Sequence, residues 1–167
     1  TPVSLVGNAP FVLVVHPSIP VKSLRDLIAL AKAKPDSLTY SSSGIGGVAH
    51  LGFVALNTAA GTRMIHVPYK GSPLQTQAAV AGEVALAFDS IPVTQPFIKS
   101  GRVRALGIGS AKRSALLPEV PSVAEAGLHG YELASWYAIF APAATPPELI
   151  DRKSTRLNSS HRCISYA

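Results

Sequence analysis

The chain has 167 residues, of which 47% are hydrophobic and 14% charged, and its formal net charge is +6. This length provides one or two small domains with a hydrophobic core, and the composition excludes a disordered chain. No apolar run approaches the roughly eighteen residues of a membrane span, and no charged-then-apolar leader opens the sequence. Because Thr1 begins in mid-pattern, we expect sequence to be missing upstream.

Strand-like and helix-like segments alternate along the chain with short connections. Residues 11–15 form a continuous apolar run, as expected for a strand buried on both faces of a parallel sheet. Ser23 and Asp26 have the spacing of a capping box, so a helix should follow and end before Pro35. Further strands are predicted from residue 38 and at 64–67, 84–88 and 103–108, and further helices at 48–60, 73–81 and 93–99. The alternation predicts right-handed βαβ crossovers and an α/β fold with a mainly parallel sheet and helices on both faces.

The stretch 38–50 is the main candidate for a binding site. It passes from a strand through three serines and a Gly-Ile-Gly-Gly turn into a helix. Unpaired amides and the positive end of the helix dipole favour an anion there, and small side chains let it approach the backbone. An ordinary βα turn has a similar composition, so this alternative stays open. The candidate ligand-binding residues of the stretch are Ser42, Ser43, Gly44, Gly46, Gly47 and His50.

Other predicted strands end in polar residues at the same edge of the sheet, where ligands of parallel sheets lie. Tyr69, Lys70 and Gly71 follow one strand and Asp89 follows another, so they join the candidate site. Each also has an ordinary role, such as a surface lysine, a tyrosine at a hydrophobic rim or a helix-capping aspartate. Asp89 would repel a bare carboxylate, which leaves it for an ordered water, a ligand ammonium or the capping of its own helix.

Patterns typical of enzymes are missing from the sequence. The serines lack the Gly-x-Ser-x-Gly of a nucleophile elbow, and no acidic residue lies between Asp36 and Glu83 to complete a dinucleotide site. Ser43, His50 and Asp89 supply the residue types of a catalytic triad, but nothing in their spacing brings them together. The histidines lack metal-ligand spacing. We therefore expect no enzymatic activity, no cofactor and no metal.

The last seventeen residues, 151–167, differ in character from the rest. They have no amphipathic period, and their back-translation reproduces the text of a sequencing adapter, so we expect a non-native tail. Without its four basic and one acidic residue the net charge falls from +6 to +3, which calls for no nucleic-acid partner. The only cysteine, Cys163, belongs to the tail; a body without thiols fits an oxidising compartment but also many cytosolic domains.

Six ordered motifs occur within residues 1–150. They are residues 3–18, Ser-Ser-Ser-Gly-Ile-Gly-Gly-Val-Ala-His-Leu at 41–51, His-Val-Pro-Tyr-Lys-Gly at 66–71, Phe-Asp-Ser at 88–90, residues 117–127 and residues 135–142. Together they resemble the Bug family, the periplasmic solute-binding proteins of tripartite tricarboxylate transporters. The resemblance implies a type II periplasmic-binding-protein-like fold and a monomeric periplasmic receptor, which captures a small carboxylate for membrane permease subunits and binds no nucleic acid.

The resemblance also implies that the chain holds one of two domains. Residues 1–10 would be a crossover strand from a truncated first domain, 11–129 the ligand-binding second domain, and 130–150 the return crossover with the start of the first domain's C-terminal part. The fragment should then hold half a binding site. The alternative function is an effector-sensing domain of a LysR-like transcription regulator, which shares the fold and would follow a helix-turn-helix.

Overall fold

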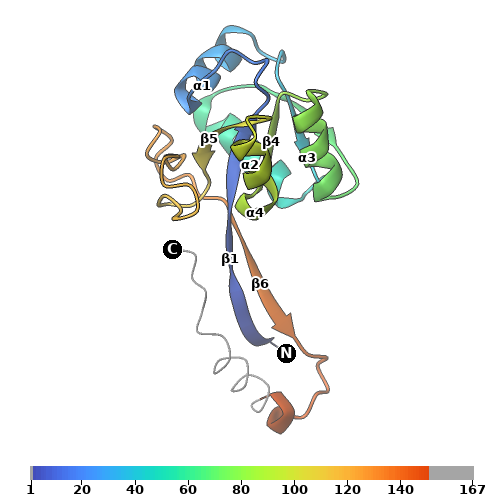
Figure 1. Ribbon diagram of the computed structural model, residues 1–167. Coiled ribbons are helices and arrows are strands. Elements are labelled where there is room, and N and C mark those ends of the chain that lie inside the picture. Colours follow the sequence, from blue (N-terminus) through green and yellow to red (C-terminus); the bar gives the residue numbers. More distant parts are fainter. Residues whose placement is uncertain (1, 151–167) are drawn as a thin grey trace.

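The computed structural model describes residues 2–150, so the tail at 151–167 lies outside the described residues. A globular α/β part carries a long two-stranded ribbon that projects from one side (Figure 1). No helix in the described residues is long and apolar enough to cross a membrane.

The strands of residues 2–150 form one sheet, in which five follow the order β3-β2-β4-β1-β5 and β6 pairs with β1 alone. They are β1 (Pro2–Val15), β2 (Thr39–Ser42), β3 (Ile65–Pro68), β4 (Leu86–Ser90), β5 (Arg104–Ile108) and β6 (Ala134–Phe140). β2 pairs parallel with β3 and β4, whereas β1 pairs antiparallel with β4 and β5. The mainly parallel α/β sheet is thus confirmed, with β1 as the strand that runs against the others.

The direction of β1 corrects the prediction for residues 11–15. The run is buried on both faces as expected, with Val12, Leu13, Val14 and Val15 all at 0% exposure. A continuous apolar run reports this burial but not the direction of the strand, because a central antiparallel strand can be covered on both faces too. β1 enters the sheet from the ribbon, so it starts at the edge where β4 ends and Phe11 pairs with Ser90.

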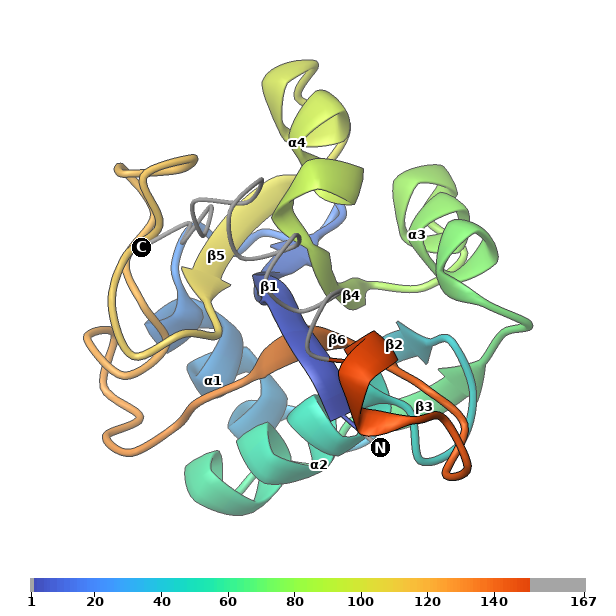
Figure 2. The same cartoon turned by 90° about the horizontal axis from the view of Figure 1, so that it is seen from below.

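Helices cover both faces of the sheet (Figure 2). They are α1 (Leu24–Ala33), α2 (Val48–Ala60), α3 (Ser72–Ala81) and α4 (Ile91–Lys99). Leu13 and Val15 of β1 point into one core cluster with α1 and α2, whereas Val12 and Val14 point into a second cluster with α3 and α4. The alternation of side chains along one strand therefore supplies both cores. All the helices expected from the sequence are present.

The predicted capping box at α1 is complete. Ser23 Oγ accepts a hydrogen bond from the Asp26 amide at 3.2 Å, and Asp26 Oδ2 accepts from the Ser23 and Lys22 amides at 3.0 Å each. The Lys22 amide and then Ser23 lower the pKa of Asp26, because these donors favour its charged form. The amides of Lys22, Ser23 and Asp26 thus have side-chain acceptors within the chain.

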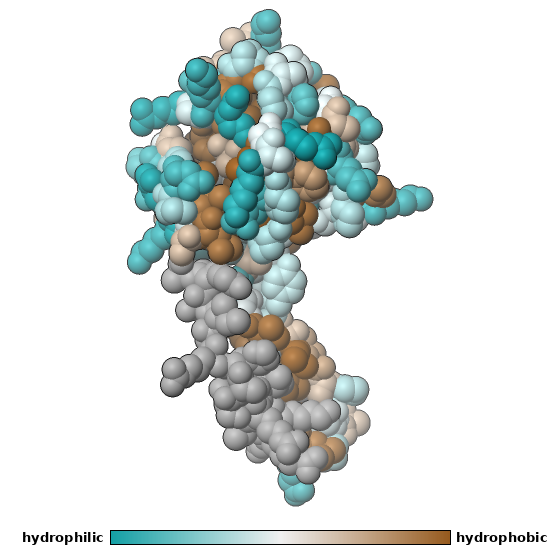
Figure 3. Space-filling view, in the orientation of Figure 1, coloured by the Kyte–Doolittle hydropathy of each residue, from teal (hydrophilic) through white to brown (hydrophobic). Residues whose placement is uncertain are grey.

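The ribbon consists of the first half of β1 and of β6, paired antiparallel from Pro2 to Pro10. Part of its surface is apolar (Figure 3), and Leu5, Trp136 and Phe140 are exposed by 59%, 63% and 60%. An exposed patch of this kind is unusual for a soluble monomer and marks an interaction surface. Since Phe11 pairs with Ser90 at the end of β4, the ribbon leaves the globular part at the edge where the parallel strands end.

Candidate functional site

Helices α2, α3 and α4 all begin at the edge where β2, β3 and β4 end. In the described chain, none of their N-cap residues, Gly47, Gly71 and Ser90, makes a side-chain capping bond. By contrast α1, which follows β1 at the opposite edge, has a complete capping box. Amide donors without a capping side chain and the positive ends of the dipoles favour an anion. The ribbon edge is therefore the candidate site.

Ser42 lies beneath the loop between β2 and α2 and holds it. Its Oγ donates to Gly44 O at 3.0 Å, accepts from the Gly44 amide at 3.2 Å, and lies 2.6 Å from His66 Nε2. The hydroxyl thus has three polar contacts within the chain, and the residue is fully buried. The structure therefore gives this predicted ligand residue a supporting position rather than a surface one.

Ser43 and the glycines form the surface of the loop. Ser43 is exposed, and a Cβ built on Gly47 would lie 3.1 Å from its Oγ, so the hydroxyl sits at the start of α2. Gly46 has φ of +79°, which L side chains rarely adopt, and its amide donates to His50 Nδ1 at 3.1 Å. The Gly47 amide closes the turn on Gly44 O at 3.2 Å. The Ser43 hydroxyl thus lies beside the start of α2, and the amides of Gly46 and Gly47 are bonded within the loop.

The turn of Tyr69, Lys70 and Gly71 lies against this loop, as the sequence predicts. The Tyr69 amide donates to Ser42 O at 2.8 Å and the Gly71 amide to Ser43 O at 3.4 Å. Tyr69 Oη instead donates to Glu83 at 3.4 Å, beyond the far end of α3, so its side chain points away from the loop. Burial, and next the charge of Glu83, raise the pKa of Tyr69. Lys70 is exposed, and neither ion pair found in residues 2–150 includes it.

Asp89 is buried, with 3% exposure, and connects β4 to the first turn of α3. Its Oδ2 accepts from Ser72 Oγ at 2.5 Å, Gln75 Nε2 at 3.0 Å and Thr76 Oγ1 at 2.6 Å. Its Oδ1 accepts from the Ser90 amide at the start of α4 at 2.7 Å. Of the roles that the sequence left open, these contacts favour capping. Asp89 lies in β4 and not after it, because the strand predicted at 84–88 is found at 86–90.

His66 is a residue of this site that sequence reasoning did not select. Its ring stacks on His50 with centroids 4.2 Å apart and on Tyr40 at 5.1 Å. Burial, and next the charge of His50, lower the pKa of His66. The sequence contained one signal that could have selected His66. Side chains alternate along a strand, so in the motif at 66–71 His66 shares a face with Pro68. Its partners, however, come from β2 and α2.

We expect the free energy of unfolding to fall as the pH drops below about 6.5, the ordinary pKa of histidine. Because the pKa of His66 is lower in the folded state, the unfolded chain binds the proton first, so acid favours unfolding. Chemical denaturation between pH 8 and pH 5 measures this slope. His66→Phe keeps an aromatic ring but cannot titrate, so its slope should be shallower; an unchanged slope would show that His66 does not contribute.

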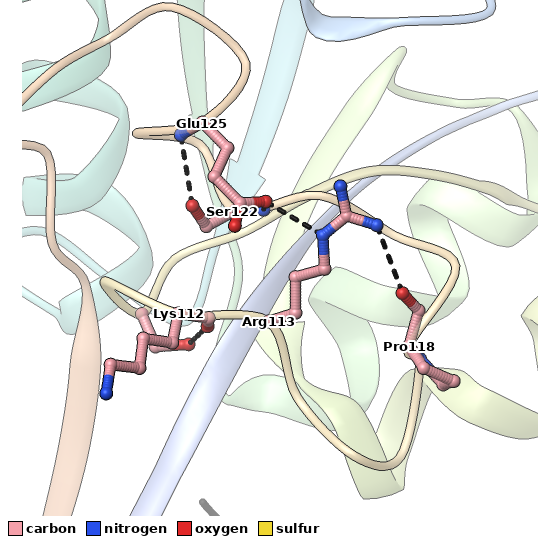
Figure 4. A network of polar contacts seen from close by, with 6 residues as sticks. Lys112, Arg113, Pro118, Ser122 and Glu125 are labelled. Atoms are coloured by element: carbon pink, nitrogen blue, oxygen red, sulfur yellow. Dashed lines mark hydrogen bonds and ion pairs between the residues drawn. The ribbon is translucent and has the colours of Figure 1, made fainter.

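The loop after β5 contains a network of polar contacts around Arg113 (Figure 4). Arg113 Nε donates to Glu125 Oε2 at 2.9 Å and its Nη1 donates to Pro118 O at 3.3 Å. Ser122 and Glu125 exchange hydrogen bonds with each other's amides at 3.0 and 3.1 Å. The Lys112 side chain points away from this network (Figure 4). Arg113 therefore holds the loop after β5 in place.

A hollow of about 450 Å³ lies elsewhere, between the first turn of α1 and the start of β5. Lys22, Arg25 and Glu119 are among its lining residues, and the loop between β2 and α2 is not. Its lining charges have mixed signs and are exposed. The ribbon edge is the stronger candidate for the binding site, because one half of a two-sided site need not form a hollow by itself.

Two solved structures similar to this chain hold a carboxylate. R. palustris Rpa4515, solved with adipate, has a TM-score of 0.88 and 38% identity, over 96% of this chain and 52% of its own. MatC from Rhodopseudomonas palustris, solved with bound malate, has a TM-score of 0.84 and 29% identity, over 94% of this chain and 54% of its own. The expected periplasmic-binding-protein fold is thereby confirmed.

Among curated proteins, BugT of Bordetella pertussis (strain Tohama I) is 35% identical over 159 residues, which are 95% of this chain and 49% of BugT. The chain thus spans about half the length of this relative, and the resemblance to the Bug family is confirmed. The model of the tripartite tricarboxylate transporter family receptors matches residues 1–167, and the chain therefore belongs to that family of solute-binding proteins.

Proposed function

We propose that this chain forms one side of a site that captures a small carboxylate for a tripartite transporter. The observation that carries the proposal is the convergence of three helix starts at one edge, where in the described chain no N-cap residue makes a capping bond with its own side chain. Adipate in Rpa4515 and malate in MatC support the choice of a carboxylate. The family match supports a receptor over the LysR-like alternative.

The residues of the site divide into two groups. Ser43, the first amides of α2 and the backbone at Gly71 would hold the carboxylate, and Lys70 would add positive charge. Gly44, Gly46 and Gly47 leave room for the anion, while Ser42, His50 and Asp89 hold the loops from beneath. Hydrogen bonds to a charged group contribute about 1.5 to 3 kcal/mol each before entropic costs.

The second side of the site would come from protein beyond this chain. The ribbon leaves from the binding edge, so whatever packs on its apolar surface would stand over the loops. This supports the domain boundaries expected from the sequence, with 11–129 as one domain and 1–10 and 130–150 as crossovers. A receptor of this kind would be a periplasmic monomer that delivers its ligand to membrane permease subunits.

We expect adipate to bind the chain at pH 7 with a Kd in the millimolar range, since one side of the site is present. Ser43→Val removes a hydrogen-bond donor and adds bulk at the start of α2. Its Kd for adipate should therefore be about tenfold higher, which is a loss of about 1.4 kcal/mol in binding free energy. NMR titration measures both. Ser100→Val, which changes an exposed serine at the C-terminal end of α4, is the matched control. If Ser43→Val and the wild type bound adipate with equal affinity, the loop would be an ordinary βα turn and not a binding site.

A further inference from the structure

The loop between β2 and α2 rests on a continuous stack of aromatic rings. Phe53 stacks on Tyr40 with centroids 4.1 Å apart, Tyr40 on His66 at 5.1 Å, and His66 on His50 at 4.2 Å. Phe53 and Tyr40 are buried in the core, whereas the two histidines are only partly buried. The stack therefore runs from the core to the surface loop and ends on two titratable rings.

Each histidine is bonded to one side of the turn. His66 Nε2 lies 2.6 Å from Ser42 Oγ, which itself is bonded to both the amide and the carbonyl of Gly44. The tautomer of His66 sets which of these two atoms donates. His50 Nδ1 accepts from the Gly46 amide at 3.1 Å. The rings thus fix the chain before and after Ile45, the most exposed large apolar residue of the loop.

The contact of His50 fixes its protonation state. An amide N–H can only donate, so Nδ1 of His50 must be an unprotonated acceptor and its proton must sit on Nε2. A proton added to Nδ1 would face the Gly46 N–H and break this bond. The turn seen here is therefore the form that belongs to a neutral His50.

We propose that His50 and His66 are positioning residues for the carboxylate site, and that the binding form of the loop exists only while His50 is neutral. The inference rests on the proposed function for its ligand but on the loop geometry for its mechanism. His66 acts through Ser42 on Gly44, and His50 acts directly on Gly46. Acid would then open the loop and release the carboxylate.

Within residues 2–150, neither of the two rings takes part in an ion pair. Tyr40 of β2 covers the other face of His66, and burial raises the pKa of this phenol, so it stays neutral. Neither ion pair found in residues 2–150 involves an imidazole. The stacked rings repel each other when both are charged, which adds to the burial that lowers the pKa of His66. A proton on His50 Nδ1 therefore gains no ion pair within residues 2–150 and loses the bond from the Gly46 amide.

The test compares the wild type with two variants of His50. Asn at this position can accept from the Gly46 amide through its side-chain oxygen but cannot titrate near neutral pH. Phe keeps a ring in the stack and has no acceptor. Without ligand, the Gly46 amide signal in NMR should shift between pH 8 and pH 6 in the wild type and stay constant in His50→Asn. His50→Phe should show the displaced signal at every pH.

With adipate as probe, His50→Phe should bind about fivefold or more weakly than the wild type at pH 8, and His50→Asn, which keeps an acceptor for the Gly46 amide, should lose less affinity than His50→Phe. The wild-type affinity should fall towards pH 6 by more than that of His50→Asn, which corrects for protonation of adipate itself. Tighter wild-type binding at pH 6, or wild-type affinity in His50→Phe, would overturn the inference while leaving the function intact. If adipate binds to none of the proteins, the proposed function fails, and the ligand-free Gly46 signal still decides whether His50 positions the loop.

Discussion

Replacing Phe53 by alanine is expected to lower the free energy of unfolding by about 3 to 5 kcal/mol, the largest effect of any change considered for this chain. Phe53 is 0% exposed on the inner face of α2. Its ring stacks on Tyr40 at 4.1 Å and contacts Phe88 with centroids 4.9 Å apart. Removing the ring leaves a cavity that a sheet and a helix cannot collapse around. Chemical denaturation measures the loss.

Val54→Ala is the matched control for this substitution. Val54 follows Phe53 on α2 but is 44% exposed, so the change should stay within about 0.5 kcal/mol. Losses of similar size in the two variants would contradict the placement of the core. Because Tyr40 separates Phe53 from His66, any folded Phe53→Ala protein should also show a displaced Gly46 amide signal.

Replacing Asp89 by alanine is expected to cost about 3 kcal/mol or more. Three side-chain donors, from Ser72, Gln75 and Thr76, converge on one buried carboxylate oxygen. Without it, the buried Thr76 hydroxyl and one N–H of Gln75 lose their acceptor, while Gln75 Nε2 keeps its bond to Phe88 O at 2.9 Å. Each unpaired group costs about 1 to 3 kcal/mol. The start of α3 would also lose its connection to β4. Thermal or chemical unfolding measures the effect.

Asp89→Asn separates the role of the acceptor from that of the charge. Its side-chain oxygen can still accept from the donors of α3, while its amide group faces the Ser90 N–H and loses that bond. We expect an intermediate loss, smaller than that of Asp89→Ala. If both variants were as stable as the wild type, Asp89 would not be the capping residue that its contacts indicate, and a ligand role would return.

Local patterns in the sequence account for much of this fold. The α1 capping box needs only residues three apart, and α2 has the predicted bounds, Val48–Ala60, because a glycine turn precedes it and Gly61 ends it in the left-handed conformation. Loop composition also identified the edge where the helices begin. Each of these features is set by neighbours in sequence.

Features that depend on distant partners were wrong or missing. The direction of β1 is fixed by its pairing with β4 and β5, and an apolar run in the sequence does not indicate this pairing. β4 extends to Ser90 because hydrogen-bond donors from α3 satisfy the Asp89 carboxylate inside the sheet. The presence of a polar residue in the sequence does not by itself indicate that such donors are available. His66 acquires its position from Ser42 and His50, 24 and 16 residues away in the chain.

A carboxylate that binds at the edge where α2 and α3 begin should be located there when adipate is mapped on the chain by amide NMR. The largest shifts should fall on Ser43 to His50 and on Lys70 to Ser72, and they should saturate together. A diamine of the same length, which carries positive charges, should leave these signals unchanged. Shifts confined to the hollow near Lys22 and Arg25, or equal shifts with the diamine, would contradict the account.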